Sequence, residues 1–555
     1  MACSKLFSGD LPELTNEIIQ CFHYDYKTLH SCILINRLWC RLAIPLLWED
    51  PFSVKLPKNY YFIETYLRNL NDDDKEKLNE YVIHNELFPS NILFNYPRFI
   101  QRLDTYKICF SIEKWVATVR ISTRRGQHSN YSMQNINLSA SQTSNFTKLI
   151  FRSLFLIFIK NEVNLHSFKM SMATFSDIEY YDEIIGLILQ NRNFIYNIKN
   201  LTLDLDDAKY NTIKFLEFLC SNCNSITSLN FLLPSFHIYP IIEKNFSQII
   251  KSQVNLKKIS FGFGDEYSLY HPLLSLNNPY CSITLSTIVF YYIDFKNIDV
   301  LSEVFNHSNV LESIHIIYCY YLDSKFIRQI NNITKPFKLK TLFLDEMNES
   351  LEPLIQKSGN YLENLGVGHY KSQKLLQLII KYCSKIKFLV PTWPDNQSIY
   401  SVINLIENIN QNLNYLLIDA LAISYNDNYN SSSIILQNLG QILPFKLEYL
   451  NLHLRINTND LEIFLKNSQN VFVKKLLIRN TKNEESQDIF PYIKEYIMKK
   501  KRVKYLAITE NYKGKNEFLI SLKDKVKEFE LYDIQVLNYE DLIINIYDLI
   551  QEIYY

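Results

Sequence analysis

The residue pairs in this sequence that could do chemistry are few, and none is complete. Cys220 and Cys223 form a Cys-x-x-Cys pair, a spacing that can supply two of the four ligands of a structural zinc ion. No second pair of this kind and no nearby pair of histidines supplies the other two ligands. We therefore interpret both residues as structural cysteines that close an apolar helix just before the next strand.

Catalytic motifs are missing in the same way. The glycine pairs at 262–264 and 366–368 lack the third glycine and the following helix of a dinucleotide site. Phosphate-binding-loop, zinc-protease and serine-hydrolase motifs do not occur, and the eleven histidines lie far apart. We expect no catalytic residue, no metal site and no cofactor. An enzyme of the α/β class is accordingly the least favoured of three interpretations.

Length and composition limit the remaining classes. A chain of 555 residues exceeds one compact core, so it forms either several domains or one long repeat array. The 58 basic and 58 acidic residues leave no net charge, which argues against a nucleic-acid partner. The longest apolar run, 154–159, is far shorter than the about 20 residues of a membrane span. With no export signal in residues 1–10, the ten cysteines indicate reduced thiols and a cytoplasmic chain.

One apolar pattern recurs from about residue 165 to the C-terminus. An apolar residue is followed by two variable residues, an apolar one, one variable residue and a third apolar one. The central apolar residues are separated by roughly 23–34 positions, a period typical of solenoid repeats. They are Phe168, Leu201, Leu229, Ile259, Ile288, Ile314, Leu342, Leu365, Leu416, Leu450, Leu476 and Leu506, with Leu389 and Phe529 as weaker members.

Each repeat combines two periodicities. Alternation around the central residue predicts a strand with one buried face, and segments such as 375–380 and 399–406 have the spacing of helices. One strand and one helix per repeat predict an α/β fold, with parallel strands on the concave face of a curved solenoid and helices on its convex face. The pattern resembles leucine-rich repeats over 161–555. Residues 51–160 are expected to be a helical or irregular connection, with a flexible Ser/Asn/Gln-rich insertion near 122–144.

The first fifty residues predict a small helical module. Pro12 suits the first turn of a helix that Asp10 can cap, and Glu13 and Glu17 suit its positive end. Two further helices are expected, over 29–39 and 42–48. A bundle of this size is too small to be robust alone, and the apolar residues on both sides of its first helix imply a partner.

These residues resemble an F-box. The family pattern is met by Leu11-Pro12, by Ile18-Ile19, by the stretch 34–39 that ends on Trp39, and by Leu47-Trp48. The resemblance implies that residues 1–50 bind a Skp-type adaptor, which joins the chain to a cullin–RING ubiquitin ligase. It further implies that the repeats bind a protein substrate. The residues expected to form or support the adaptor surface are Leu11, Pro12, Leu14, Ile18, Ile19 and Trp39.

The expected substrate surface is the concave face of the C-terminal repeats, because side chains between the buried apolar positions point the other way. Aromatic residues and arginine dominate interface hot spots, which favours Tyr415, Tyr449, His453, Arg455, Arg479 and Tyr505. The chain is then a non-catalytic substrate receptor. The alternative is a leucine-rich-repeat scaffold, unrelated to ubiquitin, whose N-terminal helices merely cap the array. Lys499–Arg502 resembles a short nuclear-import cluster or a solvated helix end, so nuclear entry is left open.

Overall fold

The structure is a computed structural model of the 555-residue chain. The residues that it describes are 11–23, 25–54, 57, 59–70, 72–79, 93–125, 139–171, 178–204, 210–233, 239–264, 269–370, 373–391, 396–420, 428–482 and 487–553. The chain divides into two compact units. The first comprises Met1–Phe261 with Ser275–Leu285, and the second comprises Gly262–Leu274 with Ser286–Tyr555.

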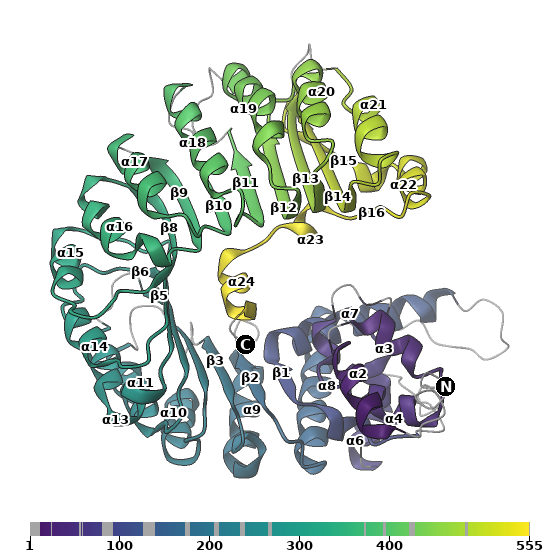
Figure 1. Ribbon diagram of the computed structural model, residues 1–555. Helices are drawn as coiled ribbons and strands as arrows, with labels where there is room; N and C mark the ends of the chain where they lie inside the picture. Colours follow the sequence, from purple (N-terminus) through teal and green to yellow (C-terminus); the bar gives the residue numbers. More distant parts are fainter. Residues whose placement is uncertain are drawn as a thin grey trace. The chain divides into compact units, whose positions relative to one another are not determined.

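The first unit begins with helices and continues as strand–helix repeats (Figure 1). Strands β1 to β4 are parallel neighbours, and Leu103, Phe168, Leu201 and Leu229 share one row of the register. Its main elements are α2 (Pro12–Gln20), α3 (Tyr26–Cys32), α4 (Arg37–Leu47), α5 (Phe62–Leu67), α6 (Asp72–Asn79), β1 (Arg102–Asp104), α7 (Thr105–Arg125), α8 (Ala140–Lys160), β2 (Ser167–Met170), α9 (Ile178–Gln190), β3 (Asn200–Asp204), α10 (Tyr210–Asn222), β4 (Ser228–Leu232), α11 (Tyr239–Ser252), the start of β5 (Lys258–Gly264) and α13 (Pro279–Thr284).

The second unit continues the alternation of strand and helix. Its elements are β6 (Thr287–Ile293), α14 (Leu301–His307), β7 (Ser313–Ile317), α15 (Ser324–Asn331), β8 (Leu339–Met347), α16 (Glu352–Ser358), β9 (Asn364–Tyr370), α17 (Gln373–Tyr382), β10 (Phe388–Val390), α18 (Asn396–Ile409), β11 (Tyr415–Asp419), α19 (Asn428–Ile442), β12 (Lys446–Leu454), α20 (Thr458–Asn467), β13 (Phe472–Lys482), α21 (Phe490–Ile493), a π-helix (Lys494–Met498), β14 (Val503–Tyr512), β15 (Lys515–Phe518), α22 (Lys523–Glu530), β16 (Gln535–Val536), α23 (Tyr539–Leu542) and α24 (Ile546–Ile553).

Within the second unit, the described strands β6 to β14 are parallel, and β15 runs antiparallel to its neighbour β14. The core lies between the sheet and helices α14 to α21, which cover one of its faces (Figure 1). The central residues Leu365, Leu416 and Leu450 are fully buried there, as is Ile379 of α17. The predicted α/β repeat with parallel strands is therefore confirmed. The opposite face of the sheet, away from α14 to α21, is called the inner face. It corresponds to the face expected from sequence to be concave.

Among the strand pairings that the described residues show, the repeat register is interrupted between β7 and β8. Ile316 pairs with Leu342, whereas the sequence pattern aligns Ile314 with Leu342, and a one-residue irregularity lies between Ile314 and His315. Such a bulge inserts an unpaired residue and bends the strand locally. The spacing of apolar residues therefore locates both strands but misaligns them by two positions.

Two expected boundaries and one expected strand differ from the structure. The sheet begins with β1 at Arg102–Asp104, inside the segment expected to be a connection. The insertion expected near 122–144 starts within α7 and ends within α8, where Ser139 and Gln142 form a reciprocal capping box; residues 126–138 lie outside the described part. The weak strand pattern at 526–531 is wrong, because these residues extend α22, whose lysines and glutamates favour a helix.

Most residues of the basic stretch Lys499–Arg502 form hydrogen bonds or ion pairs within the fold. The Arg502 guanidinium is buried and donates hydrogen bonds to the carbonyl oxygens of Leu465 and Ser468, at the end of α20. Burial lowers the pKa of Arg502 to about 10. Lys499 pairs with Glu495, and Lys501 pairs with Asp533. The exposed lysines of this stretch agree with the solvated helix end expected from sequence, whereas the buried Arg502 does not.

Candidate functional site

The N-terminal module is a three-helix bundle with a closed core. Asp25 accepts a hydrogen bond from the Thr28 N–H at 3.0 Å and so caps α3. Asn36 caps α4 in the same way through the Trp39 N–H at 2.9 Å. The second helix predicted from sequence, 29–39, is therefore interrupted at this Asn36 cap. The buried core residues are Ile19, Leu29, Cys32, Trp39, Ala43 and Leu46.

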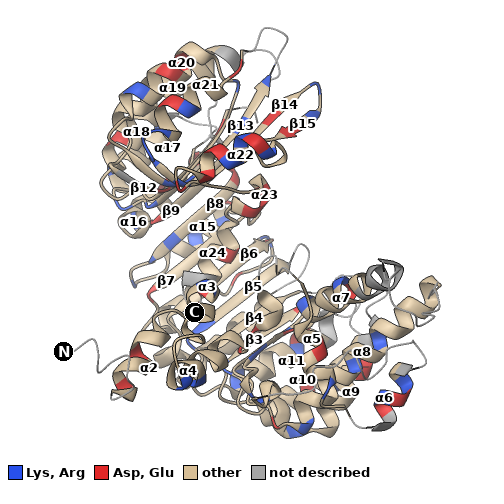
Figure 2. Ribbon diagram, turned by 90° about the vertical axis from the view of Figure 1, so that its right-hand side faces the viewer, with Lys and Arg blue, Asp and Glu red and all other residues tan. Residues whose placement is uncertain are grey.

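Several large apolar side chains remain outside this core. Leu11 and Leu14, at the start of α2, are 39% and 45% exposed. In the turn between α3 and α4, Leu34 and Ile35 are 76% and 44% exposed. Two glutamates lie on α2 and two arginines lie on α4 (Figure 2). The bundle thus presents apolar side chains with charged residues beside them, the composition of a protein interface with a polar rim.

The six residues expected at the adaptor surface divide into two groups. Leu11, Pro12 and Leu14 are exposed, and Ile18 is half-buried. Ile19 and Trp39 are buried in the bundle core, at 0% and 5% exposure, so they can support the surface but do not form it. Leu34 and Ile35 were not expected there, although the apolar residues before the Asn36 cap were a signal for them.

The end of α4 is anchored to the sheet of its own unit. The buried Glu49 carboxylate lies 2.7 Å from the His23 imidazole and 2.9 Å from the Arg102 guanidinium, at the start of β1. The Trp48 ring packs 4.1 Å from the Tyr96 ring. The boundary expected at residue 50 is therefore bridged by an ion cluster, and α4 does contact the repeats as the alternative interpretation requires.

Most of the predicted substrate residues lie in two rows on the inner face of the second unit, because the pairing of the strands aligns them. Tyr415, Tyr449 and Tyr505 lie in one row across β11, β12 and β14. His453 and Arg479 lie in another row, which also contains Asp419. The His453 Nδ1 atom is 3.1 Å from the Asp419 carboxylate. Arg455 follows the end of β12 and is half-buried.

The C-terminal segment, which contains α23 and α24, covers this part of the inner face with α23. The Tyr539 and Leu542 side chains of α23 pack on Tyr449, Leu477 and Ala507. Tyr449 is consequently 0% exposed, so its prediction as an accessible substrate residue is wrong. The physical reason is burial of apolar area by residues of the same chain.

Polar contacts fix the segment in place. The Tyr539 hydroxyl donates to the Asn451 side-chain oxygen at 2.7 Å, and the Asn451 amide donates to the Tyr449 hydroxyl at 3.2 Å. Burial raises the pKa of Tyr449 to about 12. Arg479 donates to Glu540 at 3.1 Å and lies 4.3 Å from the centre of the Tyr539 ring. Arg479 is therefore engaged by the chain's own C-terminal segment.

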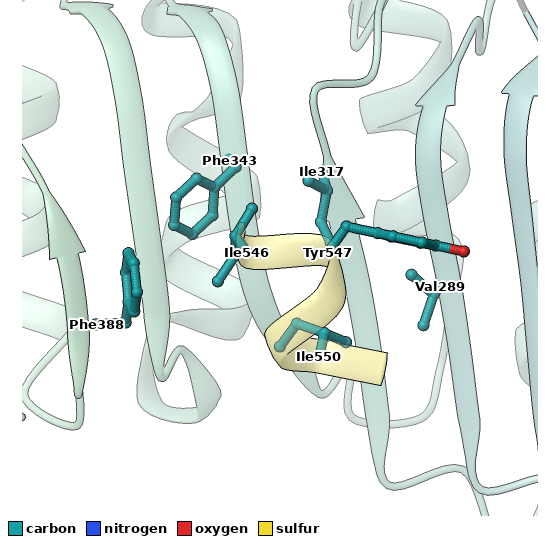
Figure 3. Packing of buried hydrophobic residues seen from close by; sticks show 7 residues of the cluster. All are labelled: Val289, Ile317, Phe343, Phe388, Ile546, Tyr547 and Ile550. Carbon is teal, nitrogen blue, oxygen red and sulfur yellow. The ribbon is translucent and has the colours of Figure 1, made fainter. Parts of the chain in front are cut away.

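Helix α24 covers a second stretch of the inner face. Its side chains Ile546, Tyr547 and Ile550 point toward strands β6, β7, β8 and β10 (Figure 3). Together they form one buried cluster with Val289, Ile317, Phe343 and Phe388. Phe343 lies so close to Gly366 that a Cβ atom there would be 2.3 Å from its ring.

Sequence reasoning missed this segment, although two signals were present. Leu542, Ile546, Tyr547 and Ile550 have the spacing of one helix face. Val289, Phe343, Phe388 and Leu477 are apolar at positions that the repeat pattern assigns to the exposed side. Apolar residues at such positions require a cover.

No metal centre is formed by the part of the chain that the structure describes. It holds no group of three His, Cys, Asp or Glu residues that could bind a metal ion. Burial raises the pKa of Cys220 to about 11 and of Cys223 to about 12, so both thiols stay protonated near neutral pH. None of the described helices is long and apolar enough to cross a membrane.

No family model matches the sequence, and no curated protein matches it.

Proposed function

We propose that this protein is the non-catalytic substrate-recognition subunit of a Skp–cullin–F-box ubiquitin ligase. In this proposal the N-terminal bundle is an F-box that binds a Skp-type adaptor, and the strand–helix units are leucine-rich repeats of a curved solenoid that holds a protein substrate. The F-box resemblance of residues 11–48 names the adaptor class. The contacts of these residues supply the physical support.

The observation that carries the proposal is the set of exposed leucines on a bundle whose core is already complete. Leu11, Leu14 and Leu34 contribute nothing to the buried cluster of α2, α3 and α4. Solvent exposure of three large apolar side chains on so small a module marks a surface for another protein.

The alternative, a repeat scaffold whose N-terminal helices are only a cap, accounts for part of the same geometry. Glu49 and Trp48 do join α4 to the repeats. A cap, however, needs its apolar side chains turned toward the array. Leu14 and Leu34 remain exposed, which favours a separate partner.

A receptor of this kind carries out no chemistry itself, because ubiquitin transfer belongs to other subunits. The buried cysteines agree with this role, since burial raises the pKa of Cys319 and of Cys383 to about 12 and so suppresses their reactive thiolates. We expect no ubiquitin thioester on the purified chain. A thioester that survives in the absence of reductant would contradict this part of the proposal.

The experiment that tests the adaptor role is co-purification with a Skp-type adaptor. Polar replacement of Leu11, Pro12 and Ile18 should abolish co-purification while the repeats remain folded, as measured by circular dichroism. A more conservative pair, Leu11→Asp with Leu14→Asp, avoids the half-buried Ile18. The matched control is Asn16→Ala with Gln20→Ala, two exposed polar positions on the same helix. Adaptor binding that survives in both leucine variants would overturn the F-box assignment.

A further inference from the structure

Four aromatic residues in the second unit have a backbone conformation that bulky side chains avoid. Phe263, Tyr292, Tyr318 and Tyr321 have φ angles of 59°, 50°, 52° and 54°. In this left-handed region Gly, Asn and Asp are tolerated, whereas other residues are strained. Among the described residues, the other non-glycine positions with positive φ are Glu162, Lys501, Lys513 and Asp533, none of them aromatic. Strain of this kind persists mainly where a site requires it.

Three of these residues, Phe263, Tyr292 and Tyr318, occupy equivalent places in successive repeats. Phe263 and Tyr292 are the next-to-last residues of β5 and β6, and Tyr318 directly follows β7. The Tyr318 N–H donates to the Phe343 carbonyl of β8 at 2.7 Å, and the Tyr320 N–H donates to the Ile293 carbonyl at 2.9 Å. The unusual backbone therefore recurs at the carboxyl ends of neighbouring strands.

The result is a series of stacked rings. Phe263 and Tyr292 have ring centres 5.6 Å apart and planes within 8°, and Tyr292 and Tyr318 follow at 5.3 Å and 23°. Tyr320 lies 6.3 Å from Tyr292. Phe263 is 48% exposed and Tyr321 is 56% exposed. We call Phe263, Tyr292, Tyr318, Tyr320 and Tyr321 the aromatic ladder.

The charge around the aromatic ladder is mainly acidic. Asp345 is exposed at the end of β8, two residues beyond the Phe343 that bonds to Tyr318. Asp294 forms a β-bridge with Tyr320. The pKa values of Tyr292 and Tyr318 are raised by burial and also by the Asp345 carboxylate. The ladder already receives one cation, since the Lys296 ammonium lies 5.5 Å from the centre of the Tyr321 ring.

We propose that the aromatic ladder binds an extended segment of a partner protein that carries arginine or lysine. Exposed aromatic faces attract cations, and the flat guanidinium of arginine also stacks on them. The carboxylates of Asp345 and Asp294 add charge complementarity and oppose the phosphates of a nucleic acid. The inference deepens the proposed function by naming the class of substrate segment. The inference rests on the proposed function only because it calls the bound segment a substrate. Binding of the segment to the aromatic ladder does not need the adaptor.

The test uses the full chain and a fluorescein-labelled peptide of four Arg-Gly repeats, followed by fluorescence anisotropy. Lysine and citrulline versions of the peptide separate the contributions of charge and of planar shape. The arginine peptide should bind, the lysine peptide should bind roughly two- to fivefold more weakly, and the citrulline peptide should not bind. A labelled uridine oligonucleotide should not bind either. Equal binding of the arginine and citrulline peptides, or preference for the oligonucleotide, would overturn the proposal.

The variants exploit the backbone strain. Phe263→Asn and Tyr292→Asn remove a ring but supply a residue that accepts positive φ. Each should weaken the arginine peptide by roughly three- to tenfold, with the melting temperature unchanged within about 2 °C or raised. Asp345→Asn should weaken binding and reduce its salt dependence. The control is Tyr400→Ala, an exposed tyrosine on α18, which should bind as the parent does.

Two outcomes refute the aromatic ladder as a binding site. One is unchanged peptide affinity in both asparagine variants. The other is a fall of the melting temperature in both variants, which would make the strained rings structural. The variant Leu11→Asp with Leu14→Asp separates the two proposals, because it should lose the adaptor and keep the peptide. If the parent chain binds the peptide but no adaptor, only the proposed function is contradicted. If it binds the adaptor but not the peptide, only the proposal for the aromatic ladder is contradicted.

Discussion

The Tyr539 hydroxyl donates a hydrogen bond of 2.7 Å to the Asn451 side-chain oxygen, although the two residues are 88 positions apart in the sequence. Asn451 lies on the inner face of β12 and Tyr539 lies in α23. The bond therefore holds the C-terminal segment against the surface that the repeat pattern alone leaves open. Both residues are almost fully buried, and a buried hydrogen bond of this kind contributes roughly 0.5–1.5 kcal/mol.

Loss of this bond should loosen the segment. Tyr539→Phe keeps the ring but removes the donor, so we expect the free energy of local opening to fall by about 1 kcal/mol. Amide hydrogen exchange within 537–544 should then be roughly fivefold faster. Ile543→Ala is the matched control, because Ile543 is exposed in the same segment. Identical exchange rates in Tyr539→Phe and the parent would show that the bond does not hold the segment.

The buried guanidinium of Arg502 should be hard to replace. It donates to the carbonyl oxygens of Val471, Leu465 and Ser468, and the compact ammonium of lysine cannot reach several acceptors at once. Arg502→Lys is expected to lower the melting temperature by about 4 °C or more. Lys504→Ala, at an exposed position two residues later, should leave it unchanged. Equal melting temperatures for the two variants would contradict a structural role for Arg502.

Two glycines make a matched pair for packing. Gly366→Ala would place a Cβ atom 2.3 Å from the Phe343 ring, whereas nothing lies within 4 Å of a Cβ atom at Gly186. Crowding at the first site should destabilise the protein by about 1–3 kcal/mol. Alanine in the middle of α9 should stabilise it by about 0.5–1 kcal/mol. Urea unfolding of both variants checks this, and a Gly366→Ala variant as stable as the parent would contradict the close approach of Phe343.

Lys258 should make stability depend on pH in the alkaline range. Burial lowers its pKa to about 8, from an ordinary value of 10.5. Between about pH 8 and 10.5 the unfolded chain therefore binds the proton that the folded chain has released, and stability rises with pH. Lys258→Met removes the buried cation, so it should stabilise the protein at pH 7 and reduce this rise. Thermal unfolding of parent and variant at pH 7.5 and 9.5 gives the difference, and parallel behaviour of the two proteins would refute it.

The repeat architecture could be predicted from local sequence, because each repeat carries its own apolar pattern for one strand and one helix. Phe168, Leu201 and Leu229 occupy one row of the sheet, and each was identified by its own apolar neighbours. The prediction of secondary structure was wrong where the same spacing of apolar residues fits both a strand and a helix. Val526 and Phe529 are three residues apart, which suits the strand pattern as well as the face of α22.

The covered inner face could not be predicted in the same way. Tyr449 was expected to be accessible because its side chain alternates with the buried Leu450, and that alternation is observed. Its cover comes from Tyr539 and Leu542, ninety or more residues later in the chain. Only pairing between distant segments decides such a contact, and spacing within a repeat carries no information about it.

The measurement that most directly tests the account is calorimetric titration of the full chain with a purified Skp-type adaptor. We predict saturable one-to-one binding that Leu11→Asp with Leu14→Asp weakens at least about 100-fold, since two buried apolar anchors contribute roughly 3 kcal/mol or more. The control Asn16→Ala with Gln20→Ala should bind as the parent does. No heat of binding with the parent chain, or equal affinity in the leucine variant, would contradict the proposal that the N-terminal helices are an adaptor-binding F-box.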